Sequence, residues 1–252
     1  RLKHIIEKAV AKGAERCEVY SLSSLNTDVD YEASRLKNVA NNEESGLALR
    51  LVKDGRLGYA TTTKVGDVDR LIDDALATAT CGEEVDYAFS GPAEMPAPSI
   101  SDESVKALSL EQMMKRSEDA IARVHEYEKE IKIESGTSRR VQKVAVATSE
   151  GLEAKFERTL YQFYIEGLLV EGDNMLNAGS FYGGSRLDDG GDSLVNEAIE
   201  DFRNGRKNVA VQGGPTKVIF TPHAIADVML ALNYGVNGAF VERGVSPLKG
   251  RL

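Results

Sequence analysis

The 252-residue chain has little of what catalytic metal sites are usually built from. It contains three histidines and two cysteines. None of His4, His125 and His223 has a second histidine, a cysteine or a carboxylate at the spacing typical of zinc ligands. Cys17 and Cys81 lie in unrelated local contexts, so we expect two reduced thiols rather than a disulfide framework. The residues alone therefore argue against a zinc hydrolase formed by this chain.

Long apolar runs and an excess of positive charge are also lacking. No stretch of about 18 apolar residues is present, and the N-terminus has the pattern of an amphipathic helix rather than a signal peptide. The net charge of −9 and the pI near 5.0 disfavour binding to nucleic acid or to an anionic membrane. The basic cluster Ser138-Arg139-Arg140 is small and is expected at a solvated hairpin end. These features predict a soluble, cytoplasmic protein whose native chain begins upstream of Arg1.

Other catalytic signatures are missing as well. There is no Gly-x-Ser-x-Gly nucleophile elbow, and the glycines at 183–184 and 190–191 lack the spacing of a dinucleotide-binding loop. Asp188, Asp189 and Asp192 have the oxygen chemistry for a calcium ion, although such a cluster is more often an exposed turn. No catalytic constellation is therefore visible from residue types and spacing.

Apolar residues at helical spacing predict helices over 2–10, 68–79, 110–124 and 194–202. Ser109 and Gln112 have the spacing of a capping box at the start of the third of these. A further helix is expected to begin at Pro222.

Alternating residues and turn signals predict antiparallel strands. The runs 46–52 and 57–62 flank Asp54-Gly55, which predicts a two-residue hairpin turn with Gly55 at positive φ. Further strands are expected over 17–22, 27–33, 129–135, 141–148, 152–158, 161–167 and 217–220. Because the connections between them are too short for helical crossovers, we expect a meander.

The order of these elements predicts an α+β fold, with helices packed on antiparallel sheets and hairpins, because no βαβ unit repeats. The segment 81–108 contains three prolines and is expected to be an irregular linker. Gly213-Gly214-Pro215 is expected to mark a boundary. It would separate an N-terminal α+β domain, 1–212, from the start of a mostly β C-terminal domain, 216–252.

Three groups of short motifs occur together along most of the chain. They are Glu-Glu-Ser-Gly at 43–46 with Asp-Gly-Arg-Leu-Gly at 54–58, Ala-Thr-Ser-Glu-Gly at 147–151 with Arg158-Thr159, and Lys-Val-Ile-Phe-Thr-Pro-His at 217–223 followed by Gly-Val-Asn-Gly at 235–238 and Arg-Gly-Val-Ser-Pro-Leu-Lys-Gly at 243–250. In this combination and order the chain resembles the TldD/PmbA (modulator of DNA gyrase) metalloprotease family, on its PmbA/TldE side.

The resemblance raises the question whether this chain has the zinc ligands of that family. Catalytic, TldD-like members carry His-Glu-x-x-x-His on a helix before a Gly-x-x-Gly turn, where the histidines face one metal and the glutamate acts as base on its water. The matching positions here are Met229, Leu230 and Tyr234. The resemblance therefore implies no cofactor in this chain, with zinc expected only in a TldD-like partner.

The family also implies a dimer, with a TldD-like catalytic subunit or with a second copy, that degrades small unfolded peptides. Gly235, Gly238, Arg243 and Ser246 are the candidate residues of a groove for the partner or the peptide. Family members are longer, so we expect the sequence to be truncated at Leu252. Two alternatives remain: a peptidase whose active residues lie beyond that point, and a regulator of DNA gyrase that acts by protein contact.

Overall fold

The computed structural model describes residues 1–86, 88–188, 190–207 and 209–251, without the side chains of residues 222 and 223. The chain divides into two compact units, Arg1–Lys207 and Asn208–Leu252, which are described separately. In the described ranges, no helix is both long enough and apolar enough to cross a lipid bilayer.

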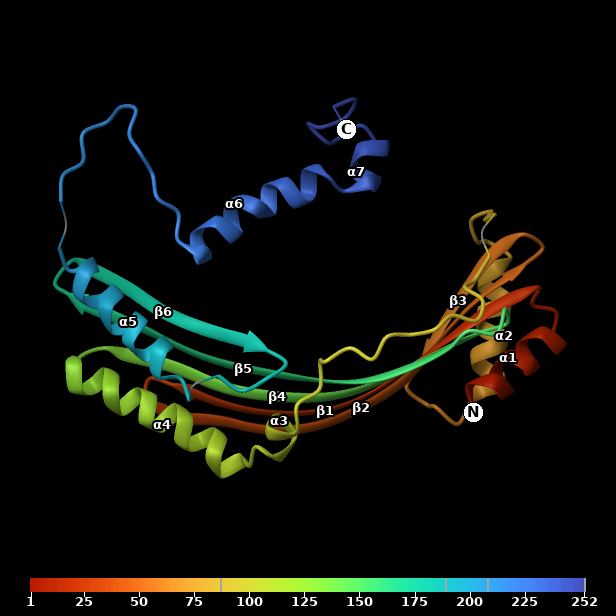
Figure 1. The fold of residues 1–252 in the computed structure, drawn as a ribbon, viewed down its shortest axis with the longest axis horizontal. Coiled ribbons are helices and arrows are strands. Elements are labelled where there is room, and N and C mark those ends of the chain that lie inside the picture. Colours follow the sequence, from red (N-terminus) through yellow and green to blue (C-terminus); the bar gives the residue numbers. More distant parts are fainter. Residues whose placement is uncertain (87, 189, 208, 252) are drawn as a thin grey trace. The chain divides into compact units, whose positions relative to one another are not determined.

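The first unit is built on a six-stranded antiparallel sheet (Figure 1). The strand order is β3-β2-β1-β4-β5-β6, so the connection from β3 to β4 is the one that does not join neighbours. The strands are β1 (Arg16–Glu32), β2 (Arg35–Lys53), β3 (Arg56–Thr62), β4 (Lys132–Thr148), β5 (Glu153–Glu171) and β6 (Asn174–Gly184). The expected α+β fold with antiparallel pairing is confirmed.

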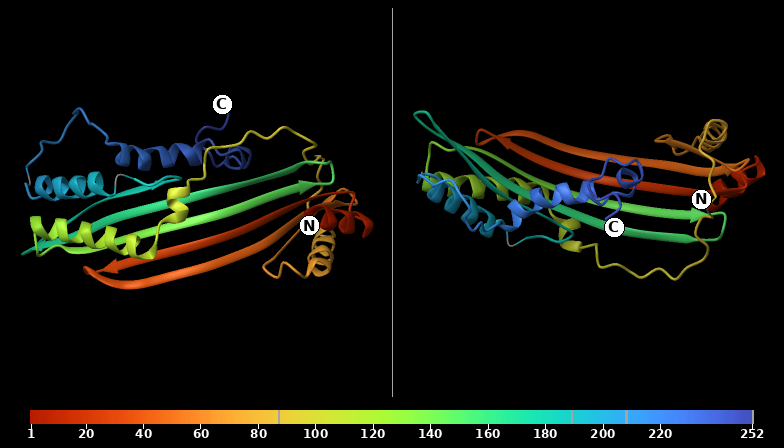
Figure 2. Two further views of the ribbon diagram at one scale, coloured as in Figure 1. Left: turned by 60° about the horizontal axis from the view of Figure 1, so that its bottom comes forward. Right: turned by 90° about the horizontal axis from the view of Figure 1, so that it is seen from above.

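The helices of the first unit lie near the ends of these long strands, except α3, which lies near their middle (Figures 1 and 2). They are α1 (Leu2–Ala11), α2 (Val68–Ala79), α3 (Glu103–Ala107), α4 (Leu110–Tyr127) and α5 (Asp192–Gly205). The capping box predicted for α4 is confirmed: Ser109 Oγ accepts from the Gln112 amide at 3.2 Å, and Gln112 Oε1 accepts from the Ser109 amide at 2.8 Å. Two of the four unpaired donors at this helix end are therefore satisfied.

The hydrophobic core of the unit is divided between the two ends of the sheet. One cluster joins α1 and α2 to β1, β2 and β4, with Leu49 and Ile72 fully buried in it. The other joins α3, α4 and α5 to β1, β4 and β5, with Phe163 and Phe202 buried in it. The two clusters have no residue in common. A fully buried Leu, Ile or Phe contributes roughly 2 kcal/mol to the free energy of folding. Because the clusters are separate, each end of the sheet is stabilised by its own buried side chains.

Between the clusters, polar side chains bond to one another across the central strands. Asn26 Oδ1 accepts hydrogen bonds from Ser24 Oγ at 2.9 Å and from Arg140 Nε at 2.7 Å. Arg139 Nη1 donates to the main-chain oxygen of Lys106 at 2.7 Å. Partners within the sheet and on α3 (Glu103–Ala107) thereby satisfy these polar side chains.

This bonding corrects the predicted strand boundaries. The breaks expected at 23–26 and 136–140 are wrong, because β1 and β4 each continue through those residues. The strand run expected to continue from 152–158 through 161–167 is one strand, β5. The basic cluster 138–140 consequently lies inside β4 and not at a hairpin end. The glycine-containing segment 178–184 also belongs to a strand, β6.

The predicted turn between β2 and β3 is confirmed. Asp54 and Gly55 have φ of 51° and 69°, and the residues that flank them, Lys53 and Arg56, pair directly. Positive φ at both central positions defines a type I′ turn, whose twist matches that of the strands.

Close contact between α2 and β3 depends on small residues. A Cβ atom added to Gly58 would lie 2.1 Å from the main-chain oxygen of Ala75 and 2.9 Å from the Cβ of Ala79. The hydroxyl of Thr78 accepts from the Tyr59 amide at 2.8 Å and donates to the Tyr59 carbonyl at 3.0 Å. The outer edge of β3 is therefore covered by this helix.

The second unit contains α6 (Pro222–Gly235) and α7 (Gly238–Glu242). Thr221 caps α6, its Oγ1 accepting from the Ala224 amide at 3.3 Å. The strand expected over 217–220 is wrong: these residues are irregular, and Ile219 is 94% exposed. A short apolar run needs a neighbouring strand to become part of a sheet, and none is described in this unit.

Candidate functional site

The residues that the resemblance assigns to the family's zinc-motif positions lie on α6. The side chains of Met229, Leu230 and Tyr234 are 50%, 53% and 59% exposed. A thioether, an isobutyl group and a phenol do not provide the imidazole, thiolate and carboxylate ligands that zinc takes in proteins. The donor set at these positions therefore does not fit zinc, and no hydrolytic step can be derived for a zinc ion held by them.

A turn after α6 contains the four residues predicted to form a groove. The buried hydroxyl of Ser246 donates to the main-chain oxygen of Gly235 at 2.5 Å, which joins the end of α6 to the segment that follows α7. Arg243 caps the end of α7 with its side chain exposed. A Cβ atom at Gly238 would meet nothing within 4 Å. The structure thus brings Gly235 and Ser246 together and leaves Gly238 and Arg243 on the surface of the unit, while the groove itself stays a prediction.

Histidines and acidic residues elsewhere are engaged in ordinary contacts. Across the described ranges, no three His, Cys, Asp or Glu side chains gather where they could hold one metal ion. His4 is exposed on α1, and His125 Nε2 lies 3.1 Å from the main-chain oxygen of Ile131. The side chain of His223 lies outside the described residues.

The aspartates considered for calcium are bound by different arginines. Asp188 Oδ1 accepts from Arg116 Nη1 at 2.6 Å, and Asp192 Oδ1 accepts from Arg123 Nη1 at 2.5 Å. Asp189 lies outside the described residues. Because each described carboxylate already forms a charge-assisted hydrogen bond, the contacts do not support the calcium hypothesis.

The contact of Arg116 with Asp188 belongs to a buried polar network. Arg116 Nη1 also donates to the hydroxyl of Tyr161 at 2.9 Å, and its guanidinium lies 5.3 Å from the centre of that ring. The Asp188 side chain is 4% exposed. Burial, together with the negative charge of Asp188, raises the pKa of Tyr161 well above its ordinary value, so the phenol stays protonated. The network connects α4, β5 and the segment before α5.

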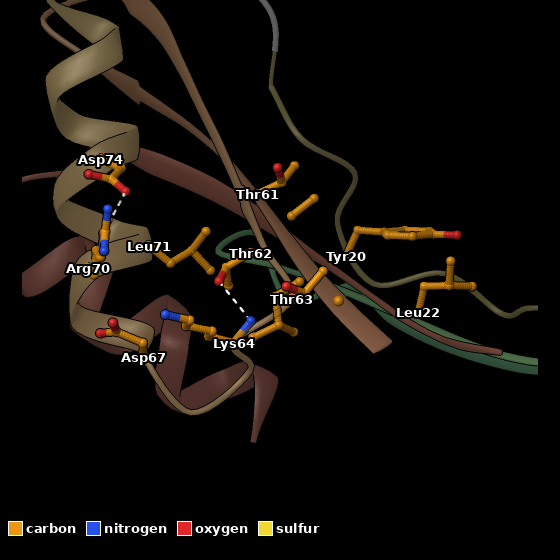
Figure 3. A pocket seen from close by; sticks show the side chains of 13 residues that line it. Tyr20, Leu22, Thr61, Thr62, Thr63, Lys64, Asp67, Arg70, Leu71 and Asp74 are labelled. Carbon is orange, nitrogen blue, oxygen red and sulfur yellow. Dashed lines mark hydrogen bonds and ion pairs between the residues drawn. The ribbon is translucent and has the colours of Figure 1, made fainter. Parts of the chain in front are cut away.

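A cleft of about 630 Å³ lies beside the end of β3, where β3 runs alongside the interior of β2 (Figure 3). Its walls come from β1, β2, β3 and α2 and include Tyr20, Leu22, Thr62, Lys64, Asp67 and Arg70. Thr62 Oγ1 accepts from the Lys64 amide at 3.0 Å, and Arg70 pairs with Asp74 at 3.6 Å. Hydroxyls, both charge signs and an apolar wall suit the cleft to bind a polar chain, but its lining has no nucleophile beside a general base.

Two family descriptions match the sequence. Residues 17–79 match the PmbA/TldA metallopeptidase domain 1, and residues 98–204 match the PmbA/TldA metallopeptidase central domain. The fold is thus a metallopeptidase-family scaffold. Because the two matches together cover more than half of the chain, it belongs to the PmbA/TldD family. A comparison with curated proteins finds no match.

Solved structures with a similar fold include TldE from Thermococcus kodakarensis, at 17% identity and a TM-score of 0.87 over 99% of this chain. Proteins provisionally described as modulators of DNA gyrase are also similar. The one from Thermotoga maritima has 16% identity and a TM-score of 0.84 over 99% of this chain. The one from Bacteroides thetaiotaomicron has 18% identity and a TM-score of 0.86 over 100% of this chain. The chain spans 58%, 58% and 60% of the length of these three structures, in the same order.

Sequence reasoning missed the cleft and the Arg116 network. The run Thr61-Thr62-Thr63-Lys64 at the end of a predicted strand, followed by a charged helix, was the visible signal for the cleft. Neither site has a fixed spacing in sequence, since Arg116 and Asp188 are 72 residues apart. Only the strand order brings such groups together.

Proposed function

We propose that this chain is a non-catalytic, TldE/PmbA-like subunit of a cytoplasmic zinc metallopeptidase complex that degrades or processes small unfolded peptides. In this proposal a TldD-like chain holds the zinc, and this chain helps to enclose the peptide. The observation that carries the proposal is the presence of Met229, Leu230 and Tyr234 at the motif positions of a chain that belongs to a metallopeptidase family.

The first experiment tests where the zinc and the activity reside. This chain and a TldD-like chain with an intact His-Glu-x-x-x-His motif are purified separately and after co-expression. We expect co-purification, with zinc and peptide cleavage in the pair and no tightly bound zinc in this chain after dialysis. About one zinc per isolated chain, together with cleavage, would instead support a peptidase in its own right.

A second experiment tests the predicted groove. Arg243 is exposed and can pair with a carboxylate of a partner, so Arg243→Glu should weaken assembly with the TldD-like chain and leave this chain folded. Lys217→Glu, at another exposed site of the same unit, is the matched control. Size-exclusion chromatography of the mixed proteins measures the effect. Equal complex formation by both variants would place the interface elsewhere.

The names of two similar structures favour a second candidate function, the regulation of DNA gyrase. The net charge of −9 is compatible with contact to a protein rather than to DNA. Affinity purification of the tagged chain from its native cells distinguishes the two: a TldD-like chain supports the peptidase complex, and a gyrase subunit supports regulation.

A further inference from the structure

Two arginines of the central strands have no carboxylate partner. Arg140 lies on β4 and Arg158 on the neighbouring strand β5, and they are called the arginine pair here. None of the ion pairs formed by the described residues includes either of them. Arg140 is half-buried and Arg158 is exposed. Both belong to short sequence motifs, the basic cluster 138–140 and Arg158-Thr159, that have no role in the proposed function.

The arginine pair lies on the face of the sheet opposite the two core clusters. Successive side chains of a strand point to opposite faces. The core residues Ala147 of β4 and Phe163 of β5 have odd numbers, so Arg140 and Arg158 point away from the core. Leu160 pairs directly with Arg140. The two arginines are therefore diagonal neighbours on one face, with about 7–8 Å between their Cα atoms.

Each of these arginines is bound by an amide, which fixes its direction without cancelling its charge. Asn26 lies directly opposite Arg140, and its Oδ1 accepts from Nε at 2.7 Å. Gln142 lies directly opposite Arg158, and its Oε1 accepts from Nε at 2.6 Å. Among the described residues, no hydrogen bond involves the terminal nitrogens of either guanidinium group. A guanidinium bound through Nε can offer Nη1 and Nη2 together to one carboxylate.

Another arginine on the same face has the carboxylate that the arginine pair lacks. Arg50 on β2 lies opposite Glu18 on β1, and its Nε and Nη2 both donate to Oε1 of that carboxylate, at 3.0 and 2.7 Å. Beside the arginine pair, amides take the cross-strand position that Glu18 has here. Asp28 shares this face, opposite Ser138, and forms no described ion pair with either arginine. Two like charges thus lie side by side, and an added anion would relieve their repulsion.

An apolar row crosses the sheet next to the arginine pair. Leu22, Val144 and Phe156 pair directly across β1, β4 and β5, so they share one face. Phe156 is 38% exposed and lies two residues before Arg158, which is about 7 Å along the strand. A ligand whose carboxylate binds the arginine pair can therefore bury an apolar group against Phe156. Inorganic phosphate would use only the charged part of this surface.

A carboxylate and an apolar group lie this close together on the last residue of a peptide. There the main-chain carboxylate and the side chain are attached to the same Cα atom. An aspartate or glutamate inside a peptide provides a carboxylate but no apolar group on the same residue. The combination of charge and apolar surface therefore favours a C-terminal residue over an internal acidic one.

We propose that the arginine pair binds the C-terminal carboxylate of a peptide whose last side chain is apolar and packs against Phe156. The choice of a peptide as ligand rests on the proposed function, and the site adds which end of the peptide this chain holds. Two guanidinium groups supply charge-assisted hydrogen bonds, and the apolar row selects the last side chain.

Competition against a labelled peptide tests the proposal. Fluorescence anisotropy follows binding of Gly-Ala-Ala-Leu, labelled with fluorescein at its N-terminus, to this chain without a TldD-like partner. Three competitors distinguish the possible ligands: the same peptide as its C-terminal amide, an amidated Gly-Ala-Glu-Ala peptide, and inorganic phosphate. We expect the unlabelled free acid to displace the probe at a concentration about tenfold lower than any of these three.

Substitutions then separate the charged part of the site from the apolar part. Arg140→Gln and Arg158→Gln should each weaken binding of the free acid about tenfold, because each removes one charged donor group. Arg158→Lys keeps the charge without the planar fork and should lose less. Arg35→Gln, at an exposed site near the start of β2, carries the same charge change and should bind as the wild type. Phe156→Ala should weaken binding of the leucine-ending peptide about threefold and leave a glycine-ending peptide unchanged.

The outcomes separate this site from the proposed function. No binding of the free acid, equal displacement by the acid and its amide, or wild-type affinity in both glutamine variants of the pair overturns the proposal. Equal displacement by phosphate also overturns it, since the site would then bind small anions only. Circular dichroism confirms that each variant is folded. Because the assay uses this chain alone, a co-expressed pair that cleaves no peptide would refute the proposed function and leave the binding result intact.

Discussion

Replacing Gly58 by alanine tests the close packing of α2 on β3. The added Cβ would lie 2.1 Å from the Ala75 carbonyl oxygen, a separation that real Cβ atoms do not show, and 2.9 Å from Ala79 Cβ. Because the obstructing atom is main chain, it cannot rotate away, so the helix has to shift from the strand. This shift loosens the packing of Leu71 and Ile72, which lie on the buried face of α2. We expect the free energy of unfolding to fall by about 1–3 kcal/mol, the usual effect of overpacking.

Urea unfolding followed by circular dichroism measures this loss, with Gly66→Ala as the matched control. Gly66 has no atom within 4 Å of the position of a Cβ and no positive φ, so its replacement should change stability by less than about 0.5 kcal/mol. If the two variants unfold at the same urea concentration, the contact between α2 and β3 is not as close as described, and the reasoning is refuted.

Three further predictions concern the turn, the buried network and the thiols. Gly55→Val should lower the free energy of unfolding by about 1 kcal/mol or more, because a β-branched residue resists positive φ; an unchanged thermal melt contradicts this. Asp188→Ala leaves the guanidinium of Arg116, whose side chain is 19% exposed, without its carboxylate and should cost about 3 kcal/mol. Asp119→Ala, which removes a surface ion pair, should cost less than about 0.5 kcal/mol, and equal effects in urea unfolding would refute the burial argument. Burial raises the pKa of Cys17 to about 11, so iodoacetamide at pH 8 should label the exposed Cys81 first and Cys17 only on unfolding, as read by mass spectrometry.

Local signals predicted much of the first unit because they act over a few residues. The turn at Asp54-Gly55 and the cap at Ser109 depend on main-chain geometry and on one hydrogen-bond partner nearby. Helices α1, α2, α4 and α5 follow the apolar spacing seen in sequence. In these places local preference and tertiary packing agree.

The strand breaks were mispredicted because their explanation is non-local. Asn26 reads as a loop residue until its partner Arg140, from β4, is known. The strand predicted over 217–220 was wrong for the opposite reason. The local pattern suggests a strand, but the described part of this unit contains no neighbouring strand with which it could pair. The cleft was harder still to predict from the sequence, because it arises from where β3 ends along β2.

The division of the core into two clusters on one sheet has a consequence for how the protein can evolve. Substitutions in clusters that share no residue should have additive effects on stability, so a change near Ile72 does not restrict which residue is acceptable near Phe202. Each end can therefore accumulate its own compensating changes while the strands keep their course. A backbone that superposes with TM-scores of 0.84–0.87 at 16–18% identity is the outcome that such independent drift would produce.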